Sequence, residues 1–174
     1  MKRIGFIFMA FIILLVTVTG CAANVKDGMA FLEEGKYSHA LEMFEKDIEK
    51  GRNLEEAYRG KGIACFELEE YGVAAESFRL ALENEAEETA TICCLLGACY
   101  MEMEEYERAL DAYENALLKE DITEELRQEA EFNLIAAYEY MGNWEAAKKQ
   151  MEKYVESYPD DTRIEKEAEF LETR

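Results

Sequence analysis

The residues of this sequence best suited to metal, redox or nucleophilic chemistry are its five cysteines and its single histidine. Cys93, Cys94 and Cys99 fall in one short stretch, whereas Cys65 and His39 lie earlier in the chain. A structural zinc site needs cysteine pairs with CxxC-type spacing or nearby histidines, and neither occurs among these residues. A histidine without partners is also a weak candidate for a general base. We therefore predict no metal site, no cofactor and no catalytic residue.

Nucleotide binding is not indicated either, because the sequence has no glycine-rich phosphate loop. Paired acids such as Glu33-Glu34, Glu55-Glu56 and Glu87-Glu88 fit helix starts and solvated helix faces. The sequence thus predicts a protein that is not an enzyme. A thiol-based redox protein stays open as the least favoured alternative, and reactive thiols in the folded protein would support it.

The charge and composition of the chain narrow its fold and its partners. Its 174 residues have a formal net charge of −20, from 39 acidic and 19 basic residues. Nucleic acid is an unsuitable partner, because binding it needs a cationic surface that displaces counterions. We interpret the acidic residues mainly as a solvated surface, with attraction of a cationic partner as the alternative. One proline, 10 glycines and abundant Glu, Ala, Leu and Lys predict an all-α fold.

The N-terminus reads as a secretion signal. Lys2 and Arg3 precede an apolar run over residues 4–18, which is short for a membrane-spanning helix. The run ends in the sequence Val-Thr-Gly-Cys at Cys21, which resembles the lipobox of bacterial lipoproteins. This resemblance implies that residues 1–20 are a signal peptide and that Cys21 is the lipidated first residue of the mature protein.

Lipidation at Cys21 would place the protein on the extracytoplasmic face of the cell membrane, since two acyl chains hold a protein stably on a bilayer. Residues 21–24 would then form a short tether, and the folded part would lie close to the membrane. An envelope location permits disulfides. Cys65 and Cys99 fall on inward helix positions, where free cysteine serves as a small apolar residue. Two alternatives therefore stay open for the cysteines, which are a disulfide and buried free thiols.

Aligning the chain on itself reveals four copies of one unit. Its alanines Ala40, Ala74, Ala109 and Ala147 are spaced by 34, 35 and 38 residues. An aromatic residue stands three positions before each alanine and a large residue four positions after it: Tyr37 and Phe44, Tyr71 and Phe78, Tyr106 and Tyr113, Trp144 and Met151. Twelve positions before each alanine stand Gly28, Gly62, Gly97 and Ile135. The pattern predicts two helices folded against each other, with a small residue where they approach closely.

A helical hairpin that recurs about every 34 residues resembles the tetratricopeptide repeat family. The resemblance implies a right-handed α-solenoid of about four repeats over 25–161, at about 25–53, 54–86, 87–121 and 122–159. The chain departs from the family pattern because the first-helix Trp is absent, the closing proline occurs only as Pro159, and Ile135 replaces the small residue. Ile164, Ala168 and Leu171 form one apolar stripe, so we expect residues 162–174 to be a capping helix.

The expected helix pairs are 25–34 with 38–50, 54–68 with 71–84, 87–102 with 106–119, and 123–141 with 144–157. The 38-residue spacing before Ala147 leaves two explanations open, which are a longer connection around 119–123 and an extended first helix. Gly35 and Gly142 fit the left-handed position that ends a helix.

The family resemblance also implies a concave groove lined by the first helix of each pair, which commonly binds peptides or helices. The residues predicted to face it are Met29, Leu32, Arg59, Ile63, Phe66, Cys94, Ala98, Met101, Phe132, Ala136, Glu139 and Tyr140. Such an apolar strip with Met and aromatic residues suits an amphipathic helix or an extended peptide. We therefore predict a lipid-anchored scaffold or adaptor with a protein or peptide partner. The alternative is an accessory subunit of an envelope assembly or secretion machine.

Overall fold

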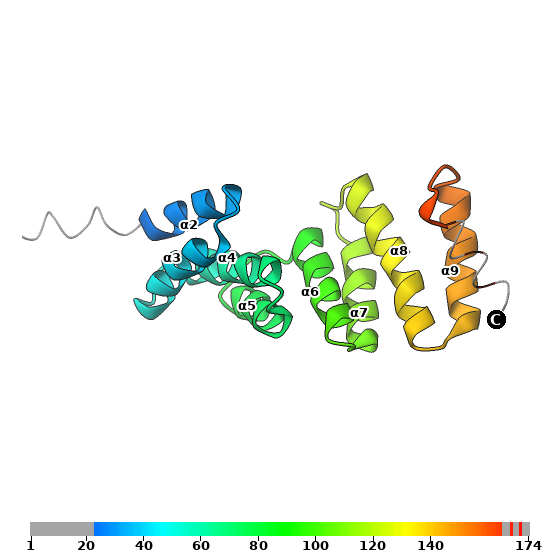
Figure 1. Ribbon diagram of the computed structural model, residues 1–174, viewed down its shortest axis with the longest axis horizontal. Helices are drawn as coiled ribbons and strands as arrows, with labels where there is room; N and C mark the ends of the chain where they lie inside the picture. The colour runs from blue at the N-terminus through cyan, green and yellow to red at the C-terminus, as the bar shows by residue number, and fades with distance from the viewer. Residues whose placement is uncertain (1–22, 165–167, 169–170, 172–174) are drawn as a thin grey trace, which may run out of the picture.

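The computed structural model describes residues 23–164, 168 and 171, and every regular element within them is a helix. The eight named helices are α2 (Ala23–Glu33), α3 (Tyr37–Glu49), α4 (Leu54–Glu67), α5 (Tyr71–Glu83), α6 (Ala90–Glu102), α7 (Tyr106–Leu117), α8 (Glu124–Tyr140) and α9 (Trp144–Ser157). They form the hairpins α2–α3, α4–α5, α6–α7 and α8–α9, which follow one another along the long axis of the molecule (Figure 1). The prediction of an all-α solenoid is confirmed for the described residues.

Each of the first three hairpins closes around a glycine that faces an aromatic ring. A Cβ atom added at Gly97 of α6 would lie 2.7 Å from Cε1 of Tyr113 on α7. The pairs Gly28–Phe44 and Gly62–Phe78 repeat this contact, with nearest distances of 2.7 and 2.6 Å. In the last hairpin the buried Ile135 packs in one cluster with Ala147 and Met151 instead. The small residue of the repeat thus lets the ring of the second helix lie directly on the first helix.

The core is a chain of local clusters that join neighbouring hairpins. One cluster contains Cys65 of α4, Phe78 of α5, and Ile92 and Cys99 of α6, so it links the second hairpin to the third. Similar clusters link the first hairpin to the second and the third to the fourth. Each hairpin therefore depends on its immediate neighbours for burial of its apolar stripe, as in other repeat proteins.

The described residues at the C-terminal end cover the last hairpin. Ile164 and Leu171 are buried in the cluster that contains Met151 and Tyr154, and Ala168 packs against it. All three residues have helical conformation. The predicted capping helix over 162–174 extends beyond the described residues, so its full span stays a prediction.

The third hairpin begins later than the sequence pattern suggested. We expected a helix from residue 87, but α6 begins at Ala90, because the side chain of Thr89 accepts a hydrogen bond from the Ile92 backbone N–H and caps the helix. Thr123 caps α8 in the same way. The connections 84–89 and 118–123 have equal lengths, whereas α8 has 17 residues and α6 has 13. The wider spacing before Ala147 therefore comes from an extended first helix.

The first helices form the inner side of the array. Two of the three pairs of neighbouring first helices touch, namely α2 with α4 and α6 with α8, whereas α4 and α6 have at most a marginal contact. Helices on the inner side of a curved stack approach one another in this way, and the surface between them is the concave surface of such a fold.

Candidate partner-binding groove

Two pockets lie between α6 and α8 and share part of their walls. The larger has a volume of about 450 Å³ and is lined by Ala98, Met101, Glu102, Glu104, Tyr106, Tyr113, Asn133, Ala136 and Tyr140. The smaller has about 240 Å³ and is lined by Thr91, Cys94, Leu95, Ala98, Tyr113, Leu126, Glu129, Ala130 and Asn133. Because Ala98, Tyr113 and Asn133 line both, the pockets form one continuous depression, which we call the α6–α8 groove.

The floor of the α6–α8 groove is formed by a buried aromatic residue. Tyr113 of α7 is only 2% exposed and packs under both pockets. Burial raises the pKa of its hydroxyl above the ordinary range of tyrosine. The walls above it have small side chains, Ala98 on α6 and Ala136 on α8, which leave the space open. These small side chains leave the ring of Tyr113 at the base of the depression.

The rim combines aromatic rings with carboxylates. Tyr140 at the end of α8 is 68% exposed, and its ring stacks on that of Tyr106 with a centroid distance of 5.2 Å and an interplanar angle of 6°. Glu102 and Glu104 line the same pocket, and Glu129 lines the other one. Among the described residues that line the α6–α8 groove, none is basic. The groove is therefore apolar at its floor and acidic at its edges.

Five predicted residues line this groove, which are Cys94, Ala98, Met101, Ala136 and Tyr140. The others do not: Met29, Leu32, Arg59, Ile63, Phe66, Phe132 and Glu139. Leu32, Ile63 and Phe66 instead pack against the cores of the first two hairpins. A role of any of these residues in partner binding stays a prediction.

The sequence predicted only part of the wall that α8 contributes, because the two walls of a groove come from opposite sides of their helices. The self-alignment places Cys94 of α6 at the position of Phe132 in α8, and both face the next hairpin. The side of α8 that faces α6 instead presents Glu129, Asn133, Ala136 and Tyr140. Ala136 and Tyr140 were predicted, and the helical spacing of these four residues could also have identified Glu129 and Asn133.

On the other side of α8, the corresponding space is occupied by the C-terminal segment of the chain. Arg163 lies over the ring of Phe132, with its Cζ 4.6 Å from the ring centroid, and donates to Glu129 at 2.9 Å and to Asp161 at 2.8 Å. Asp161 also accepts hydrogen bonds from Tyr154 and Gln128. The hydrogen bonds from Arg163 and then Tyr154 hold the pKa of the Asp161 carboxyl well below its usual range. The C-terminal segment is thus fixed on α8.

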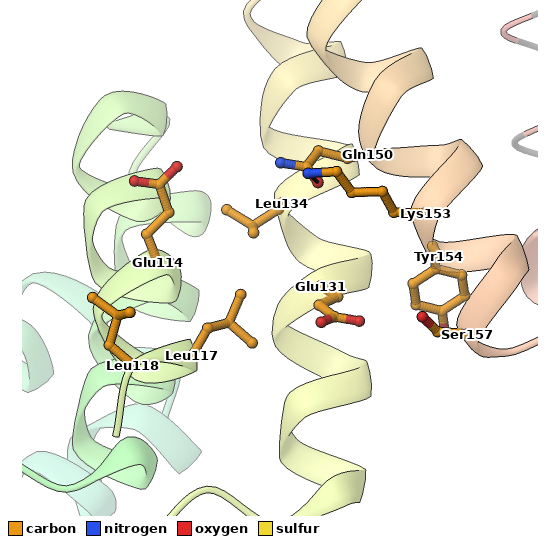
Figure 2. Close-up of a pocket in the computed structure, with 9 residues that line it drawn as sticks. All are labelled: Glu114, Leu117, Leu118, Glu131, Leu134, Gln150, Lys153, Tyr154 and Ser157. Carbon is orange, nitrogen blue, oxygen red and sulfur yellow. Dashed lines mark hydrogen bonds between the residues drawn. The ribbon is translucent and has the colours of Figure 1, made fainter. Parts of the chain in front are cut away.

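A second large pocket lies between α7, α8 and α9, on the side of the array that we call the outer side (Figure 2). It has a volume of about 520 Å³ and is lined by Glu114 and Leu117 of α7, Leu118 just after it, Glu131 and Leu134 of α8, and Gln150, Lys153, Tyr154 and Ser157 of α9. Leu118 is 82% exposed. Both signs of charge occur in its lining, unlike in the α6–α8 groove.

The described cysteines are free, and most of them are buried. Cys65, Cys93, Cys94 and Cys99 are all free, and the first two and Cys99 are buried. Burial raises the pKa of Cys65 and Cys93 to about 11 and that of Cys94 and Cys99 to about 12. His39 is exposed, with its ring 5.5 Å from that of Phe31. Among the described residues, no group of three His, Cys, Asp or Glu side chains is arranged to hold a metal ion.

The predicted signal peptide and Cys21 lie outside the described residues. Within the part that the structure covers, no helix is both long and apolar enough to cross a membrane.

Comparison with known proteins identifies the repeats. Three family models described as tetratricopeptide repeat match residues 26–88, 90–118 and 129–161, which together make up most of the chain. A search of curated protein sequences finds no significant match.

Solved structures with the same fold include several of the protein MamA. One, MamA 41-end from Desulfovibrio magneticus RS-1, is 20% identical with a TM-score of 0.73 and covers 89% of this chain and 87% of that one. A crystal structure of MamA protein is 23% identical, with a TM-score of 0.67 and coverage of 83% and 76%. The C-terminal part of a TPR repeat-containing protein from Cytophaga hutchinsonii is 18% identical, with a TM-score of 0.68 and coverage of 80% and 54%. These similarities establish the fold, and with the three matched segments they show that the chain belongs to the tetratricopeptide repeat family.

Proposed function

We propose that this protein is a lipid-anchored scaffold that holds a segment of a partner protein in the α6–α8 groove. The observation that supports this most is the groove itself, an open depression with the buried Tyr113 as its floor and small alanines in its walls. Sites that bind peptides or helices combine such apolar floors with a few polar groups at the edge. The thiols have raised pKa values, which argues for non-covalent work and against thiol chemistry.

The proposed anchor is Cys21, on the strength of its lipobox-like sequence. Helix α2 begins at Ala23, so the anchor would lie only two residues before the first hairpin. The α6–α8 groove belongs to the third and fourth hairpins, towards the other end of the array (Figure 1). In this arrangement the first hairpin would lie near the lipid and the groove would project away from it.

Photocrosslinking in the native cells tests the docking proposal. We would place p-benzoylphenylalanine at Thr91, an exposed residue that lines the groove, and at Leu118 on the outer side as a matched control. We expect a discrete crosslinked product from Thr91 only, and its loss when Ala98→Trp fills the groove. Circular dichroism checks that the Ala98 variant keeps its helices. A product that survives Ala98→Trp, or one formed from Leu118 alone, would place docking elsewhere.

The anchor is tested separately by fractionation. Cys21→Ala should move the protein out of the membrane fraction and abolish incorporation of labelled fatty acid. Cys94→Ala serves as the matched control, since Cys94 lies within the helical array, and it should leave both unchanged. Membrane attachment that persists in Cys21→Ala would refute lipidation without bearing on the groove.

A further inference from the structure

One end of the α6–α8 groove presents an open aromatic face. Tyr140 stacks on Tyr106 with one side of its ring, and the side chain remains 68% exposed. The rings are held nearly parallel, at 6°. An exposed ring that is fixed from behind offers a flat surface to a planar or cationic group.

Two carboxylates flank this aromatic face. Glu102 and Glu104 line the pocket that contains Tyr106 and Tyr140, and both are exposed. Burial raises the pKa of the Tyr106 hydroxyl, and the negative charge of Glu104 adds to the effect, which indicates that this carboxylate lies near the stacked rings. The whole chain has a net charge of −20, so it also attracts cationic groups. Charge complementarity therefore favours a cationic occupant.

The chain's own arginines display the chemistry that such a site would use. Arg163 lies over the ring of Phe132 while it bonds to two carboxylates. Arg108 lies over the ring of Tyr100, with its Cζ 4.0 Å from the centroid, and forms an ion pair with Glu105. Thus two guanidinium groups in this fold each lie on an aromatic face beside a carboxylate. This is expected because a guanidinium is planar and weakly hydrated.

Glu104 also has a backbone conformation that favours glycine. Its φ is 59°, and glycines stand in the matching turns of the first and last hairpins, with φ of 69° at Gly35 and 70° at Gly142. A residue other than glycine there costs about 1 kcal/mol. Glu69, in the second hairpin, has the same conformation with φ of 61° but does not line the groove. It therefore offers a matched control for Glu104.

We propose that this end of the α6–α8 groove binds an arginine of a basic partner segment, with the guanidinium on Tyr140 and its N–H groups donating to Glu102 and Glu104. An apolar residue next to that arginine would fill the space between Ala98 and Ala136 above Tyr113. The proposal rests on the proposed docking function and adds the chemical class of the partner.

The test uses the purified full chain and synthetic fluorescent peptides. One peptide repeats Arg-Leu-Ala, and its twin has citrulline in place of arginine, which keeps the shape and removes the charge. Fluorescence anisotropy should show preferential binding of the arginine peptide. Tyr140→Ala and Glu104→Gly should each weaken that binding by about tenfold, the size expected from losing a partly desolvated cation–π or carboxylate contact.

Matched variants separate the site from general effects. Leu118→Ala removes an exposed apolar side chain on the outer side, and Glu69→Gly removes the same charge from the equivalent turn; both should bind the arginine peptide like the unchanged chain. Glu104→Gly and Glu69→Gly should both raise the melting temperature, since glycine relieves the left-handed strain. If the melting temperature of Glu104→Gly rises, weaker binding by this variant cannot come from unfolding.

The inference is overturned if the citrulline peptide binds as well as the arginine peptide, if neither binds, or if Tyr140→Ala and Glu104→Gly bind unchanged. It is also overturned if Glu69→Gly weakens binding as much as Glu104→Gly, because the attraction would then be general. Thr91 lines the smaller pocket and not the proposed arginine site, so crosslinking from Thr91 tests the docking proposal alone. A crosslinked product there without arginine preference would reject this inference and leave the proposed function standing.

Discussion

The thiol of Cys99 lies in the cluster that joins the second hairpin to the third, with 0% of its surface exposed and a pKa raised to about 12 by burial. Because the thiolate is the reactive form of cysteine, such a group reacts slowly at neutral pH. We predict that a Cys21→Ala chain, in which only the buried and half-buried thiols remain, resists iodoacetamide at pH about 8. Denaturant should make all four thiols reactive, and mass spectrometry would count the adducts. Rapid labelling of the folded chain would revive the redox alternative.

The same pKa shift sets an alkaline limit on stability. Below the ordinary thiol pKa of 9.0, both the folded and the unfolded chain hold the proton, so the shift costs nothing. Above it the unfolded chain ionises first, and the free energy of unfolding falls by about 1.4 kcal/mol per pH unit for each such thiol. The fall continues until the folded pKa of about 12 is reached. Urea midpoints measured across this range should fall less steeply for Cys99→Ala than for the unchanged chain.

At the scale of helices, the close approach at Gly97 makes the hairpin depend on the absence of a side chain. Gly97→Ala would bring Cβ within 2.7 Å of the Tyr113 ring, which is buried and cannot move aside. We expect a loss of about 1–3 kcal/mol in the free energy of unfolding, the range measured for overpacked cores. Gly72→Ala on α5 is the control, since nothing lies within 4 Å of its Cβ position. There, the better helix propensity of alanine should stabilise the chain by up to about 1 kcal/mol.

Thermal or urea unfolding of both variants measures the difference. Equal stability of Gly97→Ala and the unchanged chain would mean that the helices of this hairpin can separate without loss. Because each hairpin touches only its neighbours, the damage should centre on α6 and α7, and hydrogen exchange should increase there before it increases in α2 and α3.

The hairpins could be predicted from sequence because their geometry depends on residues at fixed spacing. Gly97, Ala109 and Tyr113 recur in phase with their counterparts, so the self-alignment alone reveals the contact between the two helices. The groove is different, since it lies between hairpins. On α8 the sequence predicted Ala136 and Tyr140 but not Asn133, and the predicted Phe132 meets Arg163 instead. Glu102 and Glu104 were also not predicted to line the groove, because acidic residues at a helix end are usually part of the solvated surface.

At the scale of the whole molecule, the net charge of −20 is distributed over an elongated array rather than a compact globule (Figure 1). Like charges repel most strongly in the folded chain, where they are closer together than in the expanded unfolded chain. The ion pairs in the described part are mostly exposed, such as Lys46–Glu42 and Arg79–Glu76, and exposed pairs contribute only about 0–1 kcal/mol each. Self-repulsion should therefore outweigh them.

This balance predicts that salt stabilises the protein. Raising NaCl from about 0.1 M to about 1 M shortens the screening length from about 10 Å to about 3 Å, so the melting temperature should rise. KCl should act equally, because screening depends on ionic strength and not on the cation. A melting temperature that stays constant or falls would show that the ion pairs dominate. The same screening should weaken binding of the arginine peptide. Salt is therefore expected to stabilise the fold and to lower the affinity for the peptide. The melting temperature and the peptide affinity, measured over the same salt range, together separate long-range charge from contacts at Tyr140.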